Sequence, residues 1–254
     1  MAIYHLSAQV IRSSTGHSAV AAAASRRAAA LVCQATGQVF DCRAKAGVTH
    51  AELSLPTETP AWFRTAIDGL TSDRSAEVLW NAVEAKEGLK GTGLAMVLDI
   101  ALPVELNGAQ RVALARDWVE NHVTARGFVA DWAVREDDGN PHFHVMIPLR
   151  CMTDKGFGPK YELRRDAAGN VIFRDDGKPR YERMALPMKE LLGWRRSWAE
   201  TTNHHLATAG FEVRIDHRSH ADAGIEREPT RHRGVIAHRR AAKRQAATAS
   251  RSTP

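Results

Sequence analysis

The sequence of 254 residues lacks the features that mark membrane, secreted and zinc-binding proteins. No apolar run approaches the roughly 18 residues that a membrane-spanning helix needs. The N-terminus is polar by its fifth residue, which argues against a signal peptide. The three cysteines form no C-x-x-C pair and no pairing framework, which argues against a structural zinc site and fits a reducing compartment. We therefore expect a globular protein of the cytoplasm.

Glycine-rich phosphate loops are missing as well. No nucleotide-binding glycine fingerprint follows any segment that we expect to be a strand, and this disfavours a doubly wound parallel sheet. Hydrophobic periodicity and turn residues instead predict an α+β fold, with helices packed on a central antiparallel or mixed sheet. The polar turn at 136–141 joins two expected strands and indicates a β-hairpin. The expected strands are 2–11, 36–42, 94–102, 128–135, 142–149 and 211–215, the expected helices are 19–31, 60–69, 75–87 (or from 73), 107–127 and 188–209, and 152–184 is expected to be a loop or small hairpin.

Positive charge is concentrated at the C-terminal end of the sequence. Between Pro229 and Pro254 there are seven arginines or lysines and no acid, whereas the remaining residues carry 28 basic and 29 acidic side chains. A basic tail binds phosphate backbones without sequence preference, although a merely solvated terminus has the same composition. We expect one domain over residues 1–222 and a mobile basic extension over residues 223–254.

Two histidines in the second strand of the hairpin are the sharpest local signal of chemistry. On a strand, alternate residues point to the same face, so His142 and His144 project side by side while Phe143 points into the core. Two imidazoles on a rigid strand can clamp a metal that needs one or two further ligands. The alternative is that both histidines are ordinary polar surface.

Blocks along almost the whole chain resemble the relaxase domain of the MobA/MobL family, the TraA-type plasmid-mobilisation enzymes of the HUH superfamily of DNA-nicking enzymes. These blocks occur in the family's order and at its spacing. They are Met1-Ala-Ile-Tyr-His-Leu, Gly16-His-Ser-Ala-Val-Ala-Ala-Ala-Ala, Leu79-Trp-Asn-Ala-Val-Glu, Ile100-Ala-Leu-Pro-Val-Glu-Leu, Asp131-Trp-Ala-Val, Gly139-Asn-Pro-His-Phe-His, Arg196-Ser-Trp-Ala-Glu, Ile215-Asp-His-Arg-Ser and Gly224-Ile-Glu-Arg-Glu-Pro-Thr-Arg-His-Arg-Gly.

The resemblance implies an HUH relaxase fold over residues 1–222 and a transesterase that acts on single-stranded DNA at an origin of transfer. In the family, a tyrosine on the first helix attacks the scissile phosphate and leaves a 5′-phosphotyrosine link and a free 3′-OH. A divalent cation, Mg²⁺ or Mn²⁺, is held by three histidines and polarises the phosphate. His142 and His144 match two of these ligands. The resemblance also implies accessory mobilisation proteins as partners, and we expect a monomer.

Two positions depart from the family pattern. Ser25 occupies the tyrosine position, and Arg135 occupies the position of the third histidine. A serine alkoxide is harder to generate than a phenolate, and the shorter side chain reaches less far. Arginine stays protonated and cannot ligate a metal, but its guanidinium can clamp a phosphate where the ion would sit.

Three accounts fit these departures. The two residues were introduced to trap a DNA-bound state, or they are natural and the protein binds origin DNA without cutting it. In the third account the site is rebuilt, with Glu136 as third metal ligand (or Asp137 or Asp138) and with His17 or Tyr4 as nucleophile. The alternative is that neither residue has a functional role, Ser25 being a residue on the helix surface and Arg135 a charged residue at the end of a strand.

Other residues are candidates for supporting roles. Asp99 interrupts an apolar strand, where it can orient a metal ligand or accept a proton, or simply pair with an arginine. Trp194 and Trp198 lie four apart on a helix, and core packing explains them more simply than base stacking. The candidate DNA-binding residues are His17, Arg26, Arg27, Arg218 and Arg231.

The leading hypothesis is a relaxase domain that binds and nicks single-stranded origin DNA with a covalent 5′-phosphoprotein link. The second is a catalytically disabled protein that binds origin DNA without forming an adduct. A third is an unrelated two-histidine phosphodiesterase, which would hydrolyse DNA with a metal-bound water and leave no protein attached.

Overall fold

The computed structural model describes residues 4–13, 17–88, 92–137, 139–183 and 188–218, together with Asp222 and Gly224. The chain divides into two compact units, Met1–His217 and Arg218–Pro254, and the architecture that follows is that of the first unit. The expected boundary after residue 222 stays a prediction, and most of the basic extension lies outside the described residues. Within the described ranges, no helix is both long and apolar enough to cross a membrane.

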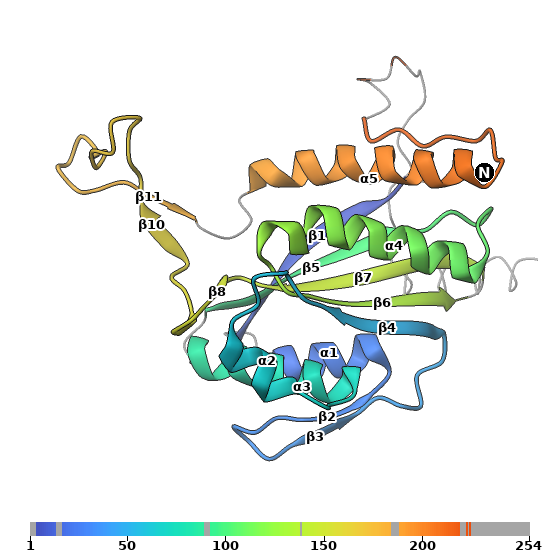
Figure 1. The fold of residues 1–254 in the computed structure, drawn as a ribbon, viewed down its shortest axis with the longest axis horizontal. Helices are drawn as coiled ribbons and strands as arrows, with labels where there is room; N and C mark the ends of the chain where they lie inside the picture. Colours follow the sequence, from blue (N-terminus) through green and yellow to red (C-terminus); the bar gives the residue numbers. More distant parts are fainter. Residues whose placement is uncertain are drawn as a thin grey trace, which may run out of the picture. The chain divides into compact units, whose positions relative to one another are not determined.

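The centre of the first unit is a five-stranded antiparallel sheet (Figure 1). The hairpin strands β6 and β7 lie inside it, with the predicted turn between them. Long-range pairing brings the N-terminal strand β1 beside β5, and β5 beside β7. In spatial order the strands are β1 (Leu6–Arg12), β5 (Gly93–Ala101), β7 (Asn140–Pro148), β6 (Ala130–Asp137) and β4 (Val48–Ser54).

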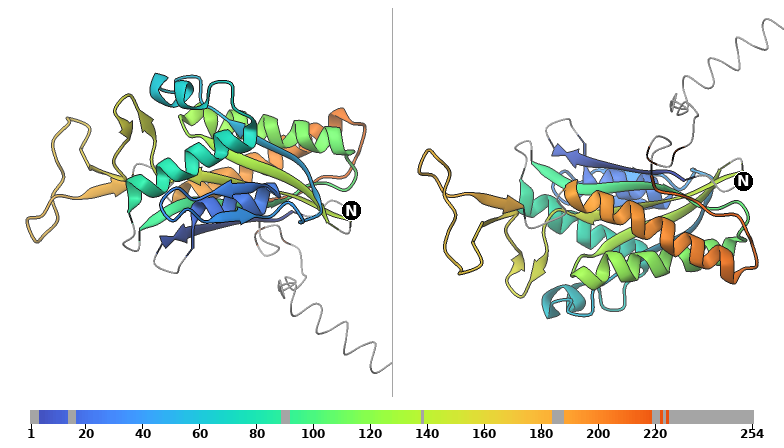
Figure 2. Two further views of the ribbon diagram at one scale, coloured as in Figure 1. Left: turned by 90° about the horizontal axis from the view of Figure 1, so that it is seen from below. Right: turned by 90° about the horizontal axis from the view of Figure 1, so that it is seen from above.

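Helices cover both faces of this sheet, as Figures 1 and 2 show. One face carries α1 (Ala19–Arg27), α2 (Ala61–Ile67) and α3 (Ser72–Glu87), and the other carries α4 (Gly108–His122) and α5 (Met188–Thr208). A short 3₁₀ turn, η2 (Thr124–Arg126), follows α4. Two apolar cores result, one on each face, because alternate residues of each strand enter opposite cores. The predicted α+β fold is confirmed.

The strand alternation around the two histidines is confirmed in detail. Phe143 is fully buried in the core below α4 and α5, while its neighbours His142 and His144 point to the face that carries α1. Trp194 and Trp198 of α5 are buried in the same core as Phe143, so packing accounts for both.

The first helix is shorter than the predicted 19–31. It begins after the predicted N-cap Ser18, whose hydroxyl accepts a hydrogen bond from the Ala21 amide, and it ends at Arg27. Ala28 then takes a left-handed conformation with φ of 51°, and the chain turns into the strand β2 (Ala30–Val32). Pairing of β2 with β3 (Val39–Asp41) therefore overrides the helix propensity of the alanine-rich run.

Two further predictions of local structure need correction. The edge strand β4 was not predicted, and the predicted strand at 211–215 is absent, since residues 211–217 carry no regular structure. The reason in the second case is the Asn203 side chain, which donates to the Ile215 carbonyl (2.9 Å) and accepts from the Ile215 amide (2.8 Å) in place of a neighbouring strand. The segment predicted as a loop or small hairpin holds β8 (Met152–Thr153), β9 (Gly156–Phe157), β10 (Tyr161–Leu163) and β11 (Tyr181–Arg183), paired as two hairpins.

Candidate metal and phosphate site

Three potential metal ligands meet on the α1 face of the sheet. His142 and His144 come from β7, and Asp99 lies directly opposite His144 on β5. One nitrogen or oxygen from each side chain lies within 4.8 Å of the others. The carboxylate Oδ1 of Asp99 is 3.8 Å from Nδ1 of His144, and the two imidazole rings are 4.9 Å apart between centroids. We call the Asp99–His142–His144 set the metal cluster.

The tautomer of His142 is set by a backbone contact. Its Nδ1 is 2.9 Å from the carbonyl oxygen of Asn140, and because a carbonyl only accepts, Nδ1 carries the proton. In the neutral ring Nε2 then holds a lone pair. A backbone carbonyl that orients an imidazole in this way is the usual outer support of a histidine metal ligand.

His144 is held in its neutral form. Burial lowers its pKa to about 4, against the opposing influence of the Asp99 carboxylate. The nearby positive charges of Arg26 and Arg135 lower the pKa further. Nδ1 of His144 is buried and has no hydrogen-bond partner among the described residues. A neutral imidazole keeps a lone pair on one of its two ring nitrogens, and such a buried ring beside a carboxylate is chemically suited to a cation, so the residues present fit a divalent metal.

The structure does not bring the predicted third ligand, Glu136, to this cluster. On β6, Glu136 lies one residue beyond Arg135 and therefore points to the opposite face of the sheet. There its carboxylate pairs with the guanidinium of Arg111 of α4 at 2.8 Å. The alternatives at 137 and 138 cannot be placed, because the Asp137 side chain and Asp138 lie outside the described residues.

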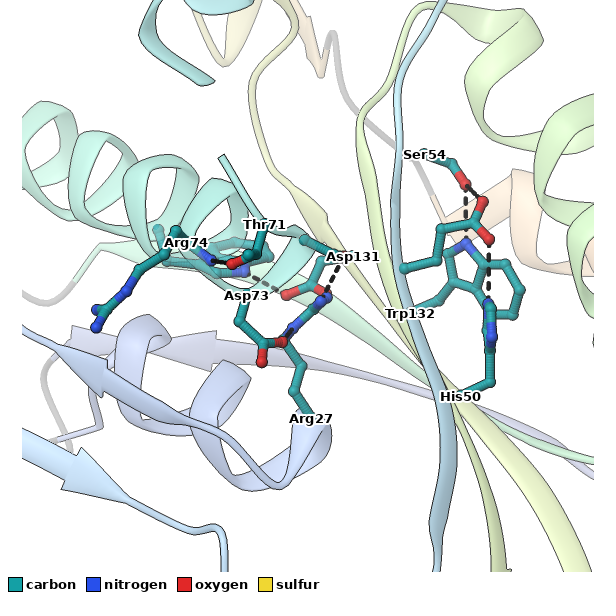
Figure 3. A network of polar contacts seen from close by, with 11 residues as sticks. Arg27, His50, Ser54, Thr71, Asp73, Arg74, Asp131 and Trp132 are labelled. Atoms are coloured by element: carbon teal, nitrogen blue, oxygen red, sulfur yellow. Dashed lines mark hydrogen bonds and ion pairs between the residues drawn. The ribbon is translucent and has the colours of Figure 1, made fainter. Parts of the chain in front are cut away.

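Arg27, a predicted DNA contact, is built into the protein interior (Figure 3). Its guanidinium donates to Asp131 of β6 at 2.5 Å and to Asp73 of α3 at 2.8 Å. A third donor nitrogen reaches the Ser72 hydroxyl at 2.6 Å, and Trp80 donates to the second oxygen of Asp131 at 2.6 Å. This network ties the end of α1 to the sheet and to α3, so Arg27 has a structural role in the folded chain.

Arg26, the preceding residue, lies near enough to the metal cluster for its charge to act on it. Burial lowers the pKa of its guanidinium, and the negative charges of Asp131 and Asp99 oppose that shift. Nη1 donates to the Ala22 carbonyl within α1 at 3.2 Å, while the buried Nε has no partner among the described residues. Of the α1 residues singled out in the sequence, Arg26 is the one whose charge acts on both Asp99 and His144.

Ser25 and Arg135, the two departures from the family pattern, meet at one loop. The Ser25 hydroxyl accepts a hydrogen bond from the ammonium of Lys45, in the loop between β3 and β4. The next residue, Ala46, accepts a hydrogen bond from Nη2 of Arg135 through its carbonyl at 2.9 Å. Ser25 lies about 160° around the helix from Arg27, so the two side chains leave α1 on nearly opposite sides. Lys45 was missed by sequence reasoning because it sits in a short polar loop without a motif.

Of the remaining predicted residues, His17 and Tyr4 belong to the first unit, and Arg218 and Arg231 belong to the second. His17 is exposed just before the N-cap of α1, Arg218 belongs to the second unit, and Arg231 is outside the described residues. Tyr4 packs against the core on the α5 side, where its hydroxyl donates to the Arg195 carbonyl at 3.3 Å. Burial raises the Tyr4 pKa far above its ordinary value, so this hydroxyl is poorly suited to act as a nucleophile.

Comparisons with known proteins agree on one family. The model of the MobA/MobL family matches residues 17–243. A probable conjugal transfer protein TraA of Sinorhizobium fredii is 41% identical over 92% of this chain and 21% of that protein. The mobilization protein MobL of Acidithiobacillus ferridurans is 33% identical over 93% of this chain and 63% of that protein. The chain thus spans about a fifth of the length of the TraA relatives that it matches.

A solved structure shares the fold. This structure, "Molecular Basis of Vancomycin Resistance Transfer in Staphylococcus aureus", aligns with a TM-score of 0.70 at 25% sequence identity. The alignment covers 86% of this chain and all of the other. The similarity therefore extends over most of this chain.

Proposed function

Because the chain belongs to the MobA/MobL family, we propose that it is a relaxase domain that binds single-stranded DNA at an origin of transfer and nicks one strand. The observation that carries this proposal is the metal cluster, Asp99 with His142 and His144, on the sheet face next to the end of α1. The names of the relatives, which are conjugal transfer and mobilisation proteins, support the same substrate. We further propose that it acts in the cytoplasm as a monomer, with accessory mobilisation proteins at the origin.

We assign Asp99, His142 and His144 as the residues that hold a divalent cation, Mg²⁺ or Mn²⁺. When bound, such an ion neutralises charge on the non-bridging oxygens of a phosphate. The chain's own contribution is to orient one of the two imidazoles and to keep the other neutral. The Asn140 carbonyl orients His142, and burial keeps His144 neutral at physiological pH.

Ser25 is the proposed nucleophile, at the position where the family has its tyrosine. Its Oγ would form a bond to the phosphorus of the scissile phosphodiester while the bond from phosphorus to the 3′-oxygen breaks. The serine proton passes to water and the departing 3′-oxygen takes a proton from water, which leaves a 5′-phosphoserine link and a free 3′-OH.

A second candidate function is origin binding without cutting. One specific observation favours it: the Ser25 hydroxyl accepts a hydrogen bond from the ammonium of Lys45, a group that has donors only and cannot take the serine proton. A serine without a base is a poor nucleophile. In this candidate the metal cluster and its surroundings serve only to hold the DNA strand.

The test mixes the chain with a supercoiled plasmid that carries a TraA-type origin, in Mn²⁺, and stops the reaction with detergent. Open circles with covalently attached protein support the relaxase, and loss of the adduct in Ser25→Ala identifies the nucleophile. The double variant Ser25→Tyr with Arg135→His is run beside it, with His142→Ala as a negative control. If only the double variant forms the adduct, the binding function is correct, and nicking without attached protein indicates a hydrolytic phosphodiesterase.

A further inference from the structure

Three cationic side chains from three separate elements lie near the end of α1, and two of them, Arg26 and Arg135, act electrostatically on His144 of the metal cluster. Arg26 comes from α1, Lys45 from the loop before β4, and Arg135 from β6. Arg135 lies opposite His142 in the register of β6 and β7, and its side chain shares the face of the sheet with both histidines. This arrangement brings positive charge to a place where a divalent cation is also expected.

Contacts connect two of these cations with each other. The ammonium of Lys45 donates to Ser25, and the carbonyl of the adjacent Ala46 accepts from the guanidinium of Arg135 at 2.9 Å. The Gly47 carbonyl in turn accepts from the Glu136 amide at 2.8 Å, which fixes the loop to β6. The loop therefore holds Lys45 and Arg135 beside the end of α1, where Ser25 and Arg26 are located.

Arg26 adds a buried donor to this group. Its Nε is buried without a partner among the described residues, and its charge acts on Asp99 and on His144. The other nearby carboxylate, Asp131, is taken by Arg27 at 2.5 Å and by Trp80 at 2.6 Å. A buried guanidinium with an unused donor is costly unless a ligand completes its hydrogen bonds.

We propose that Arg26, Lys45 and Arg135 form a binding site for a phosphodiester of the DNA backbone, and that this site holds the phosphate without a divalent metal. The inference rests on the proposed function for the identity of the ligand as single-stranded DNA. Guanidinium groups offer paired donors that match phosphate oxygens, and a lysine adds a mobile positive charge. The positive charges of the same side chains repel a divalent cation and so weaken its binding to the metal cluster. The negative charge of a bound phosphate reduces this repulsion. DNA and metal therefore bind cooperatively, each strengthening the other.

The first experiment measures binding of a fluorescein-labelled thymidine oligonucleotide by anisotropy, in EDTA, over a series of salt concentrations. The variants are Arg26→Gln, Lys45→Gln and Arg135→Gln. The matched control is Arg43→Gln, two residues before Lys45, whose exposed guanidinium pairs with Asp41 at 2.6 Å. We expect each site variant to weaken binding about 5- to 10-fold and to reduce the salt slope by about one. The control should stay within about twofold.

A structural role would give a different pattern. Lys45 is exposed, so its glutamine variant keeps the fold and isolates the charge, and thermal unfolding of all variants identifies any that lose stability. Lys45→Arg and Arg26→Lys retain the positive charge and should restore the salt slope. If the three glutamine variants bind the oligonucleotide in EDTA as tightly as the wild-type chain, or if the wild-type chain binds only when Mn²⁺ is added, the phosphate site is refuted.

The second experiment titrates Mn²⁺ by calorimetry with and without the oligonucleotide. We expect DNA to tighten Mn²⁺ binding to the wild-type chain, and this gain to shrink in Arg135→Gln. An equal Mn²⁺ affinity with and without DNA contradicts the cooperativity. These readouts do not depend on cutting. Weaker binding of the variants in EDTA supports the phosphate site even if the plasmid assay yields no nick. If the chain nicks the plasmid but its variants bind the oligonucleotide normally, the phosphate site is overturned and the proposed function is not.

Discussion

The two faces of the central sheet are made by alternating residues of the same strands, yet they differ in chemistry. Below α4 and α5 the face is an apolar core of interlocking aromatic rings, in which Phe143 is 5.2 Å from Trp198 and Trp118 is 5.9 Å from Trp198 between centroids. Toward α1 the same strands present the metal cluster and the buried Arg27–Asp131 pair (Figure 3). The comparison shows that the α1 face combines an apolar core with the chemical groups, whereas the other face is apolar, and the strand period of two separates them at neighbouring positions such as His142 and Phe143.

The apolar face should respond most strongly to truncation. Trp198 is fully buried between Trp118 and Phe143, so Trp198→Ala removes a large ring and leaves a cavity. We expect a loss of about 3 to 5 kcal/mol in the free energy of unfolding, measured by urea denaturation. Oligonucleotide affinity of the chain that remains folded should be unchanged. A loss below about 1 kcal/mol would contradict the description of this face as the stabilising core.

On the face of the sheet that carries α1, the buried Arg27–Asp131 ion pair contributes to stability. Asp131→Ala leaves the buried guanidinium with the half-exposed Asp73 as its remaining carboxylate, and we expect a loss of about 3 to 4 kcal/mol. The double variant Arg27→Leu with Asp131→Leu removes both charges and should lose less than the single variant. Urea denaturation of both variants checks the order. The reverse order would mean that the intact pair stabilises the fold by more than the burial of one unpaired guanidinium costs.

Two carboxylates on opposite faces give a matched test of the metal cluster. Asp99 lies 3.8 Å from His144, whereas Glu136 pairs with Arg111 on the far side of the sheet. Asp99→Asn should weaken Mn²⁺ binding, measured by calorimetry, by at least about tenfold. Glu136→Gln should leave it within about twofold. Comparable losses in both variants would show that the geometry of the cluster has been misassigned.

The smallest expected effect on the free energy of unfolding is at the C-terminal end of α1. Ala28 has a left-handed backbone with φ of 51°, which disfavours any residue with a Cβ atom. Ala28→Gly should stabilise the protein by about 1 kcal/mol in urea denaturation. The control is Ala29→Gly, at a buried position where φ is not positive, which should destabilise it. Stabilisation by both variants would point to a cause other than the backbone conformation.

Sequence reasoning predicted the parts of this fold that depend on short-range patterns. The alternation of His142, Phe143 and His144 places both imidazoles on one face whatever the rest of the chain does. The end of α1 could not be predicted, because the alanines after Arg27 favour a helix and only pairing with a distant strand turns them out of it. The same limit hid β4, whose half-buried Glu52 accepts a hydrogen bond from Arg116 of the distant helix α4 at 2.7 Å.

The site was predicted in part for the same reason. Asp99 was recognised as an acid in an apolar strand, but its position opposite His144 depends on the pairing of β5 with β7. Glu136 was predicted to lie in the turn after the strand, because the end of β6 was expected at Arg135, two residues too early, which hid its alternation with Arg135. Lys45 reaches Ser25 from a loop, and loop geometry carries no periodic signal.

The antiparallel register of β5 and β7 has a consequence for how sequences of this kind can vary. A deletion of one residue directly after His144, with the rest of β7 keeping its register, would turn both imidazoles into the aromatic core and expose Phe143 on the other face. Such a chain would lose its core and its ligands in one event, so a stably folded protein with a displaced site is not accessible by this route. Changes of length are therefore expected in the turn between β6 and β7, where an added residue shifts no side chain across the sheet.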